Sequence, residues 1–205
     1  MGDNDIALIA HIFRRAGFGL NREELESYSD KGYDAIVEEL LHPEMQEALD
    51  DDLIERHYVW YRAAVSFESS QAKWVYRMIN TKRLLEEKIA LFWHGILCTG
   101  ESKVENGTQM SLTIDMFRRL GLGNFRDLLI ELAKDPGMVF YLDNNLSHKD
   151  AINENWGREL LELFSLGVGM DGNPNYTEQD VKECARAFTG WTVGNLIPRY
   201  PYTRY

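Results

Sequence analysis

Residues Arg83–Gly100 read RLLEEKIALFWHGILCTG, the most apolar helical stretch of the chain. Charged residues come first and apolar residues follow, which is typical of a helix that starts in solvent and continues into a core. On a helical wheel, Glu87, Leu91, His94 and Cys98 share one narrow arc. His94 is therefore expected to be buried, and a buried imidazole is usually neutral and donates its N–H to a carbonyl or carboxylate.

Helical periodicity recurs along most of the chain, and no convincing alternating strand is found. Helices are predicted within residues 4–17, 22–44, 45–67, 70–81, 83–100, 107–123, 124–137, 153–169 and 177–191. Gly32 interrupts the second helix, and Thr177 with Asp180 predicts a capping box at the start of the last one. We predict an all-α fold, a compact bundle of about eight or nine helices with little or no sheet. It forms one helical domain over residues 1–193.

The end of the chain has a different composition. Residues 194–205 read GNLIPRYPYTRY, with two prolines and three tyrosines. Proline disfavours a continued helix, so we expect an extended Pro/Tyr-rich tail.

Composition excludes several classes of protein. The chain has 205 residues, of which 44% are hydrophobic and 27% charged, and 33 acidic against 22 basic side chains give a net charge of -11. Nucleic-acid binding is disfavoured because a phosphate backbone would be repelled. No apolar run is long enough for a membrane-spanning helix, so no membrane partner is expected.

Localisation and redox state follow from two further features. The N-terminus carries acids where a signal peptide needs bases, so a cytoplasmic protein is expected, or an exported one if a leader was removed. Cys98 and Cys184 form no zinc motif and fall on apolar helix faces. Buried free thiols are favoured over a disulfide.

The stretch Asn153–Gly169, NENWGRELLELFSLGVG, contains a misplaced carboxylate. On a wheel, Glu159 falls between Leu163 and Leu166, inside an apolar face that also contains Trp156, Leu160 and Phe164. Burying an isolated carboxylate costs more than a helix can return. Glu159 is therefore expected to pair with an arginine, for which Arg14, Arg15 and Arg118 are candidates, or to coordinate a metal or act as an acid or base. Glu154, Arg158 and Glu162 form an i, i+4, i+8 column that predicts a surface ion-pair ladder.

Five blocks of the sequence resemble, in the same order, a bacterial family catalogued as domain of unknown function 1800. The blocks are HIFRRAGFGLNREEL, RLLEEKIALFWHGIL, LGNFRDLLIELAKDPGMVFYLDN, NENWGRELLELFSLGVG and YTEQDVKECARAFTGWTV. The resemblance covers most of Ile12–Val193. Its signature blocks contain His94 and the polar residues Asn153, Glu154, Arg158, Glu159 and Glu162.

The resemblance implies a largely helical bacterial protein without an assigned activity. The resemblance also implies relatives that are often exported and encoded beside a sulfatase-like exported family. Members continue for a long second part beyond TGWTV, so the resemblance implies that this chain is the N-terminal part of the family's length. A missing C-terminal part would then be one candidate partner.

Two functions compete. The preferred one is a scaffold or partner-binding module with a buried polar His/Glu/Arg network, whose protein partner docks on aromatics of residues 56–67 and of the tail. It predicts that Glu159→Gln lowers stability by about 1–4 kcal/mol.

The alternative is a metal-dependent enzyme, a hydrolase or oxidoreductase, with its site between the helices predicted for 83–100 and 153–169. A divalent metal ion would be its cofactor. The candidate catalytic residues are His94, Glu159, Asn153 and Glu154, with Asn155 assisting, and the candidate metal ligands are His94, Glu159 and Glu162.

Overall fold

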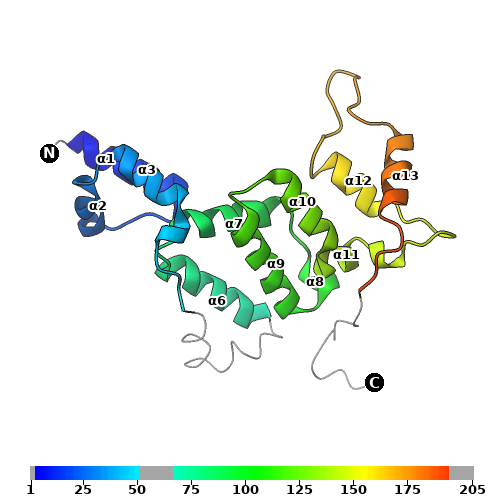
Figure 1. Ribbon diagram of the computed structural model, residues 1–205, viewed down its shortest axis with the longest axis horizontal. Coiled ribbons are helices and arrows are strands. Elements are labelled where there is room, and N and C mark those ends of the chain that lie inside the picture. The colour runs from blue at the N-terminus through cyan, green and yellow to red at the C-terminus, as the bar shows by residue number, and fades with distance from the viewer. Residues whose placement is uncertain (1–2, 51–66, 194–205) are drawn as a thin grey trace.

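The computed structural model describes residues 3–50 and 67–193 (Figure 1). Within these ranges the chain forms eleven α-helices, nine of them with seven or more residues, and no strand. The α-helices are α1 (Asp3–Ala16), α2 (Arg22–Ser29), α3 (Tyr33–Leu41), α6 (Phe67–Asn80), α7 (Leu84–Ile96), α8 (Glu101–Val104), α9 (Gly107–Leu120), α10 (Phe125–Lys134), α11 (Pro136–Tyr141), α12 (Asn155–Glu162) and α13 (Glu178–Ala187), with the 3₁₀ turns η1 (Pro43–Met45) and η2 (Asn144–Leu146). The predicted all-α fold is confirmed.

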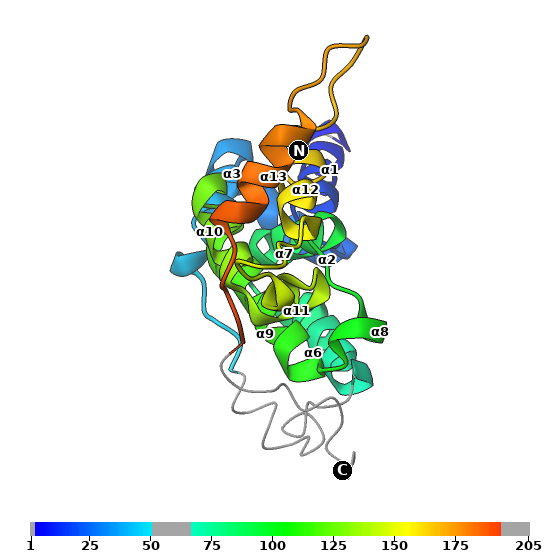
Figure 2. The same cartoon turned by 90° about the vertical axis from the view of Figure 1, so that its right-hand side faces the viewer.

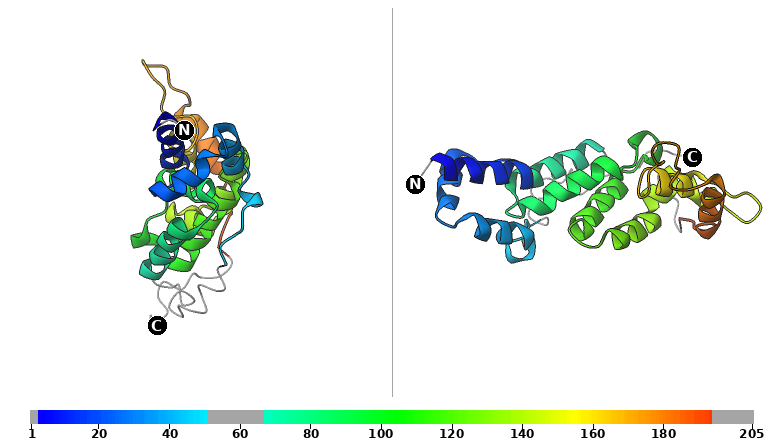
Figure 3. Two further views of the ribbon diagram at one scale, coloured as in Figure 1. Left: turned by 90° about the vertical axis from the view of Figure 1, so that its left-hand side faces the viewer. Right: turned by 90° about the horizontal axis from the view of Figure 1, so that it is seen from above.

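Helices α1, α2 and α3 form one end of the molecule (Figures 1 and 3). Their core consists of Ile9, Ile12, Phe13, Ile36 and Leu40. Helix α2 starts at a capping box, in which Asn21 and Glu24 each accept a hydrogen bond from the other's backbone N–H. Gly32 separates α2 from α3 with a φ of 82°, a left-handed conformation that favours glycine. The predicted interruption at Gly32 is confirmed.

The larger core lies in the middle of the molecule. Its buried residues are Ala90, Leu97, Met116, Phe117, Leu128, Leu132, Ala133, Met138, Trp156 and Phe164. Helices α7 and α9 lie side by side, and Gly121 follows α9 where it meets α7. A Cβ at Gly121 would lie 2.6 Å from Ile89 Cγ2 and 2.9 Å from Trp93 Cδ1. Only a glycine therefore fits where the end of α9 approaches α7. Trp93 Nε1 donates a hydrogen bond to the Gly121 carbonyl oxygen at 2.9 Å.

Helix α7 belongs to both cores. Leu84 and Leu85 at its start pack against the N-terminal core, whereas Ala90 in its second half lies in the larger core. Helix α7 also contacts α1, α3, α6 and α9. The stretch of sequence that is richest in apolar residues is therefore the helix that joins the two parts. A domain boundary at residue 193 stays a prediction.

Helices α12 and α13 form the other end of the molecule (Figures 1 and 2). They pack backbone to backbone at Gly157, where a Cβ would lie 2.8 Å from the Ala185 nitrogen and 3.0 Å from the Val181 carbonyl oxygen. Thr177 and Asp180 form the predicted capping box at the start of α13.

The chain between α12 and α13 projects away from the helices (Figures 1 and 2). We call residues 166–175 of this connection the arm. Asn175 closes its base, because the Asn175 side-chain amide donates to the carbonyl oxygens of Leu166 at 2.7 Å and Gly167 at 3.2 Å.

Two helix predictions need correction. The helix predicted for 45–67 is not found at residues 46–50, which are non-helical after η1, and its remainder lies outside the described residues except for Phe67. The helix predicted for 153–169 ends at Glu162. Gly167 takes a φ of 72° and donates its N–H back to the Leu161 carbonyl at 3.0 Å, which turns the chain out of the helix.

Other predictions concern the cysteines, the tail and the membrane. Both thiols are free as predicted, but Cys184 is only half-buried. Cys98 is exposed, because α7 ends at Ile96 and the predicted helix face does not extend to it. The predicted tail, residues 194–205, lies outside the described residues. In the part of the chain that the structure describes, no helix combines the length and apolarity that crossing a bilayer requires.

Candidate functional site

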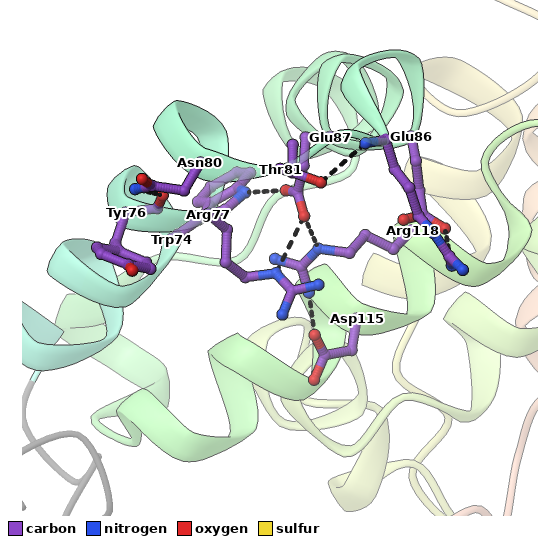
Figure 4. Close-up of polar contacts among 10 residues, drawn as sticks. Trp74, Tyr76, Arg77, Asn80, Thr81, Glu86, Glu87, Asp115 and Arg118 are labelled. Atoms are coloured by element: carbon purple, nitrogen blue, oxygen red, sulfur yellow. Dashed lines mark hydrogen bonds and ion pairs between the residues drawn. The ribbon is translucent and has the colours of Figure 1, made fainter. Parts of the chain in front are cut away.

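The most deeply buried charged side chain in the described structure is Glu87 on α7, which is 0% exposed. Its carboxylate points between α6 and α9 (Figure 4). Glu87 Oε2 accepts a hydrogen bond from Trp74 Nε1 at 3.0 Å. Glu87 Oε1 accepts from Arg77 Nε at 3.1 Å and from Arg118 Nε at 2.5 Å.

These contacts compensate the buried charge. The Arg118 guanidinium also forms an ion pair with Asp115, so two arginines face two carboxylates (Figure 4). We call Trp74, Arg77, Glu87, Asp115 and Arg118 the Glu87 network. A buried carboxylate without partners would strongly destabilise the fold. Glu87 is tolerated because three donors bind it, and these interactions depend strongly on the relative orientation of the groups. The network therefore holds α6, α7 and α9 in one relative position.

A cleft of about 500 Å³ lies beside the Glu87 network. Four arginines line it, Arg77, Arg83, Arg118 and Arg119, together with the carboxylates of Glu44, Glu86 and Asp115. Burial raises the pKa of Glu86, and the nearby Arg83 guanidinium opposes that rise. The arginines of the cleft are thus largely matched by acids, and the cleft is a mixed polar surface rather than an anion site.

His94 lies two turns after Glu87 on α7 and is only half-buried, less than predicted. Its ring meets the Trp74 ring edge-on, with centroids 5.0 Å apart. Burial lowers the pKa of His94, which favours the neutral imidazole as predicted. Trp74 therefore touches both polar residues that the wheel of residues 83–100 singled out.

Glu159 does not have the environment that the sequence predicted. The side chain is half-buried, and no hydrogen bond or ion pair reaches its carboxylate from residues 3–50 or 67–193. Among its predicted partners, Arg118 binds Glu87 instead, while Arg14 and Arg15 lie on α1 at the opposite end of the molecule (Figure 1).

The end of α12 explains this difference. Leu163 and Leu166 lie at and beyond the end of α12 and are 64% and 51% exposed, so they do not cover Glu159. These two leucines were the neighbours that placed Glu159 within a buried face. Trp156 and Phe164 are buried as predicted.

The other carboxylates of α12 have partners. Arg158 donates to both carboxylate oxygens of Glu178, at 2.9 and 2.7 Å, and to Glu154 at 3.4 Å. The predicted ladder is thus present at Glu154 and Arg158. Glu162 instead accepts a hydrogen bond from Tyr176 Oη at 3.1 Å. Desolvation and this hydrogen bond raise the pKa of Tyr176.

Asn153 stabilises the start of α12. Its side-chain oxygen accepts from the Asn155 N–H at 2.9 Å, and its own N–H donates to Ser147 Oγ at 3.1 Å. These are the contacts of a residue that orients the chain entering a helix.

The structure does not bring the predicted metal ligands together. His94 meets α6, whereas Glu159 and Glu162 lie on α12 beside α13. Among the described residues, no three His, Cys, Asp or Glu side chains form a group that could hold a metal ion. The catalytic roles of His94, Glu159, Asn153 and Glu154, and the metal-ligand roles of His94, Glu159 and Glu162, stay predictions.

An apolar groove of about 510 Å³ lies between α10, α12 and the segment that follows α13, and no motif predicted it. It is lined by Phe125, Arg126, Leu129, Ile130, Ala133, Lys134, Leu160, Leu161, Ser165, Leu166, Phe188 and Trp191. We call it the α10–α12 groove. The sequence of residues 124–137 could have indicated it, because apolar residues there cover more than one helix face. Leu128 and Leu132 are buried in the core, while Phe125 and Ile130 stay exposed.

A protein-family model described as "Protein of unknown function (DUF1800)" matches residues 11–204. The chain therefore belongs to this family, as its resemblance predicted. No curated protein and no solved structure matches the chain.

Proposed function

We propose that this member of the DUF1800 family is a protein-binding module, which binds an apolar segment of a protein partner in the α10–α12 groove. The observation that carries the proposal is the groove itself. Its lining is almost wholly apolar, although the chain has a net charge of -11. Contiguous apolar surface that remains open to water is typical of sites that bind other proteins.

The side chains of the groove suit a protein segment. Phe125, Phe188 and Trp191 contribute aromatic rings, which supply much of the binding energy at protein interfaces. Leu129 and Ile130 contribute aliphatic side chains to the lining. Burying such side chains stabilises a complex by roughly 25 cal/mol for each Å² removed from water.

Charge at the rim indicates what flanks the bound segment. The polar residues at the groove include two cations, Arg126 and Lys134. Lys134 forms an exposed ion pair with Glu131 at 2.9 Å, and no partner for the Arg126 guanidinium is found in the described ranges. A segment with a carboxylate next to its apolar residues would therefore be favoured over a basic one.

The scaffold holds the groove in a defined shape. Helix α10 presents its outer face to the groove while Leu128 and Leu132 anchor its inner face in the larger core. The Glu87 network holds the neighbouring α7 and α9. A preorganised site loses less entropy on binding, which supports affinity.

Selection from a random peptide display library on the immobilised protein tests the proposal. We expect selected peptides to share apolar residues beside Asp or Glu. Ile130→Asp, which places a carboxylate in the groove lining, should weaken their binding by about tenfold or more. Binding is measured by fluorescence anisotropy with labelled synthetic peptides.

Leu112→Asp is the matched control, because Leu112 is an exposed leucine on α9 outside the groove. It should leave peptide binding unchanged. Equal loss in both variants, peptides without apolar residues, or binding of a fatty acid with no peptide selected would overturn the proposal. The expectation that the family's C-terminal part supplies the partner stays a prediction.

A further inference from the structure

The arm has a shape of its own. Asp171 and Gly172 form its tip, with φ values of 56° and 77°, and the Asn173 N–H donates to the Met170 carbonyl at 3.0 Å. Two successive residues with positive φ, of sequence Asp-Gly, are typical of a tight hairpin turn. Together with the two hydrogen bonds from Asn175 at its base, this turn gives the arm a defined backbone.

A glycine is required beside the tip. Gly169 has a φ of 90°, and a Cβ there would lie 2.1 Å from the Asn173 carbonyl oxygen and 3.0 Å from the Asn175 nitrogen. The two sides of the arm therefore approach as closely as backbone allows. The arm is therefore a hairpin rather than an irregular loop.

The arm presents apolar side chains to solvent. Val168 is 62% exposed and Met170 at the tip is 81% exposed. Leu166 at the base also lines the α10–α12 groove. The arm therefore begins at the groove and carries exposed apolar side chains toward its tip, where Met170 precedes Asp171 in sequence.

The tip matches the chemistry that the groove requires. The groove offers an apolar lining that also includes Arg126 and Lys134, and the tip offers an apolar side chain followed by a carboxylate. The tip points away from α10 of its own chain (Figures 1 and 2). It is therefore placed to reach another molecule.

We infer that the partner is a second copy of this chain, and that two copies exchange arms. Met170 of each copy enters the α10–α12 groove of the other near Ile130, and Asp171 faces Arg126 or Lys134. Because each chain carries both the arm and the groove, a twofold axis makes both contacts at once, which closes the assembly as a dimer. This inference rests on the proposed function, since it names the occupant of the same groove.

Sedimentation equilibrium of the whole chain tests the inference. The wild type should form a dimer that dissociates on dilution. Met170→Asp at the arm tip and Ile130→Asp in the groove should each weaken self-association by about tenfold or more. Leu112→Asp should associate like the wild type, and circular dichroism checks that every variant stays helical.

Cross-linking tests the arrangement directly. The experiment uses a chain with Cys98→Ser and Cys184→Ala, which removes the native thiols. In this background, Met170→Cys is prepared in one sample and Ile130→Cys in another. After mixing and mild oxidation, a disulfide-linked heterodimer should form. Replacing Ile130→Cys with Leu112→Cys in the second sample should remove it.

The outcomes separate the two proposals. A monomeric wild type whose groove still selects peptides rejects the second copy and leaves the proposed function standing. A dimer that survives Met170→Asp also rejects arm exchange. If Ile130→Asp changes neither peptide binding nor self-association, the proposed function itself fails.

Discussion

Glu87 on α7 and Glu159 on α12 are both glutamates among apolar helix residues, yet their environments differ. Glu87 is completely buried and receives hydrogen bonds from Trp74, Arg77 and Arg118. Glu159 is half-buried, and its carboxylate has no partner in the part of the chain that the structure describes. In this protein, the carboxylate on the apolar face of a helix is fully buried where neighbouring helices supply hydrogen-bond donors to it.

The neighbours of the two helices account for the difference. Helix α7 lies between α6 and α9, and each of these supplies an arginine to Glu87. Helix α12 packs against α13 through the bare backbone of Gly157, and its own Arg158 binds Glu178. The contacts of α7 therefore include a compensated buried charge, whereas α12 meets α13 through close backbone packing and an ion pair.

The largest expected effect comes from neutralising Glu87. Glu87→Gln keeps the size of the side chain but leaves two buried guanidinium groups facing an uncharged amide. We expect the free energy of unfolding to fall by about 3–5 kcal/mol. Urea denaturation followed by circular dichroism measures it.

Glu159→Gln is the matched comparison, and it should change the free energy of unfolding by about 0.5 kcal/mol or less. This replaces the larger loss that the sequence predicted for Glu159. Similar losses in the two variants would mean that the carboxylates are equivalent, and the distinction between the regions would then be wrong.

The next effect tests the backbone contact of α12. In Gly157→Ala, the new methyl group would lie 2.8 Å from the Ala185 nitrogen, which is closer than van der Waals contact allows, and must push α13 outward. We expect a loss of about 1–3 kcal/mol in thermal or urea unfolding.

Gly95 on α7 provides the opposite case. A Cβ at Gly95 meets nothing within 4 Å. Gly95→Ala should therefore stabilise the protein by up to about 1 kcal/mol through helix propensity. A neutral or stabilising Gly157→Ala would show that α12 and α13 have room to separate.

The smallest effect concerns pH and His94. Burial lowers the pKa of His94 in the folded protein, whereas the unfolded chain titrates at about 6.5. As the pH falls from 6.5 toward the folded pKa, the unfolded state binds the proton more readily, so stability decreases; above 6.5 this loss is absent.

His94→Gln should remove this contribution. The stability of the variant, measured by thermal unfolding over a pH series, should depend less on pH below 6.5 than that of the wild type. Parallel pH profiles would show that the environment of His94 does not disfavour its charged form.

The sequence alone determined the all-α class, the interruption at Gly32 and the capping box of Thr177 and Asp180. These depend on residues a few positions apart, through hydrogen-bonding periodicity and local conformational preference, and so can be read along the chain. The wheel also placed Glu87 and His94 on one arc. It failed at Glu159, because Leu163 and Leu166, which were to bury it, lie at and beyond the end of α12 and are exposed.

Only the tertiary structure decided which carboxylate is compensated and where the surface stays apolar. The arginines that bind Glu87 are 10 and 31 residues away in sequence and meet it because α6 and α9 flank α7. The α10–α12 groove likewise joins side chains from three separate segments. Charge pairing and apolar exposure depend on distances between helices, and helical periodicity contains no information about those distances.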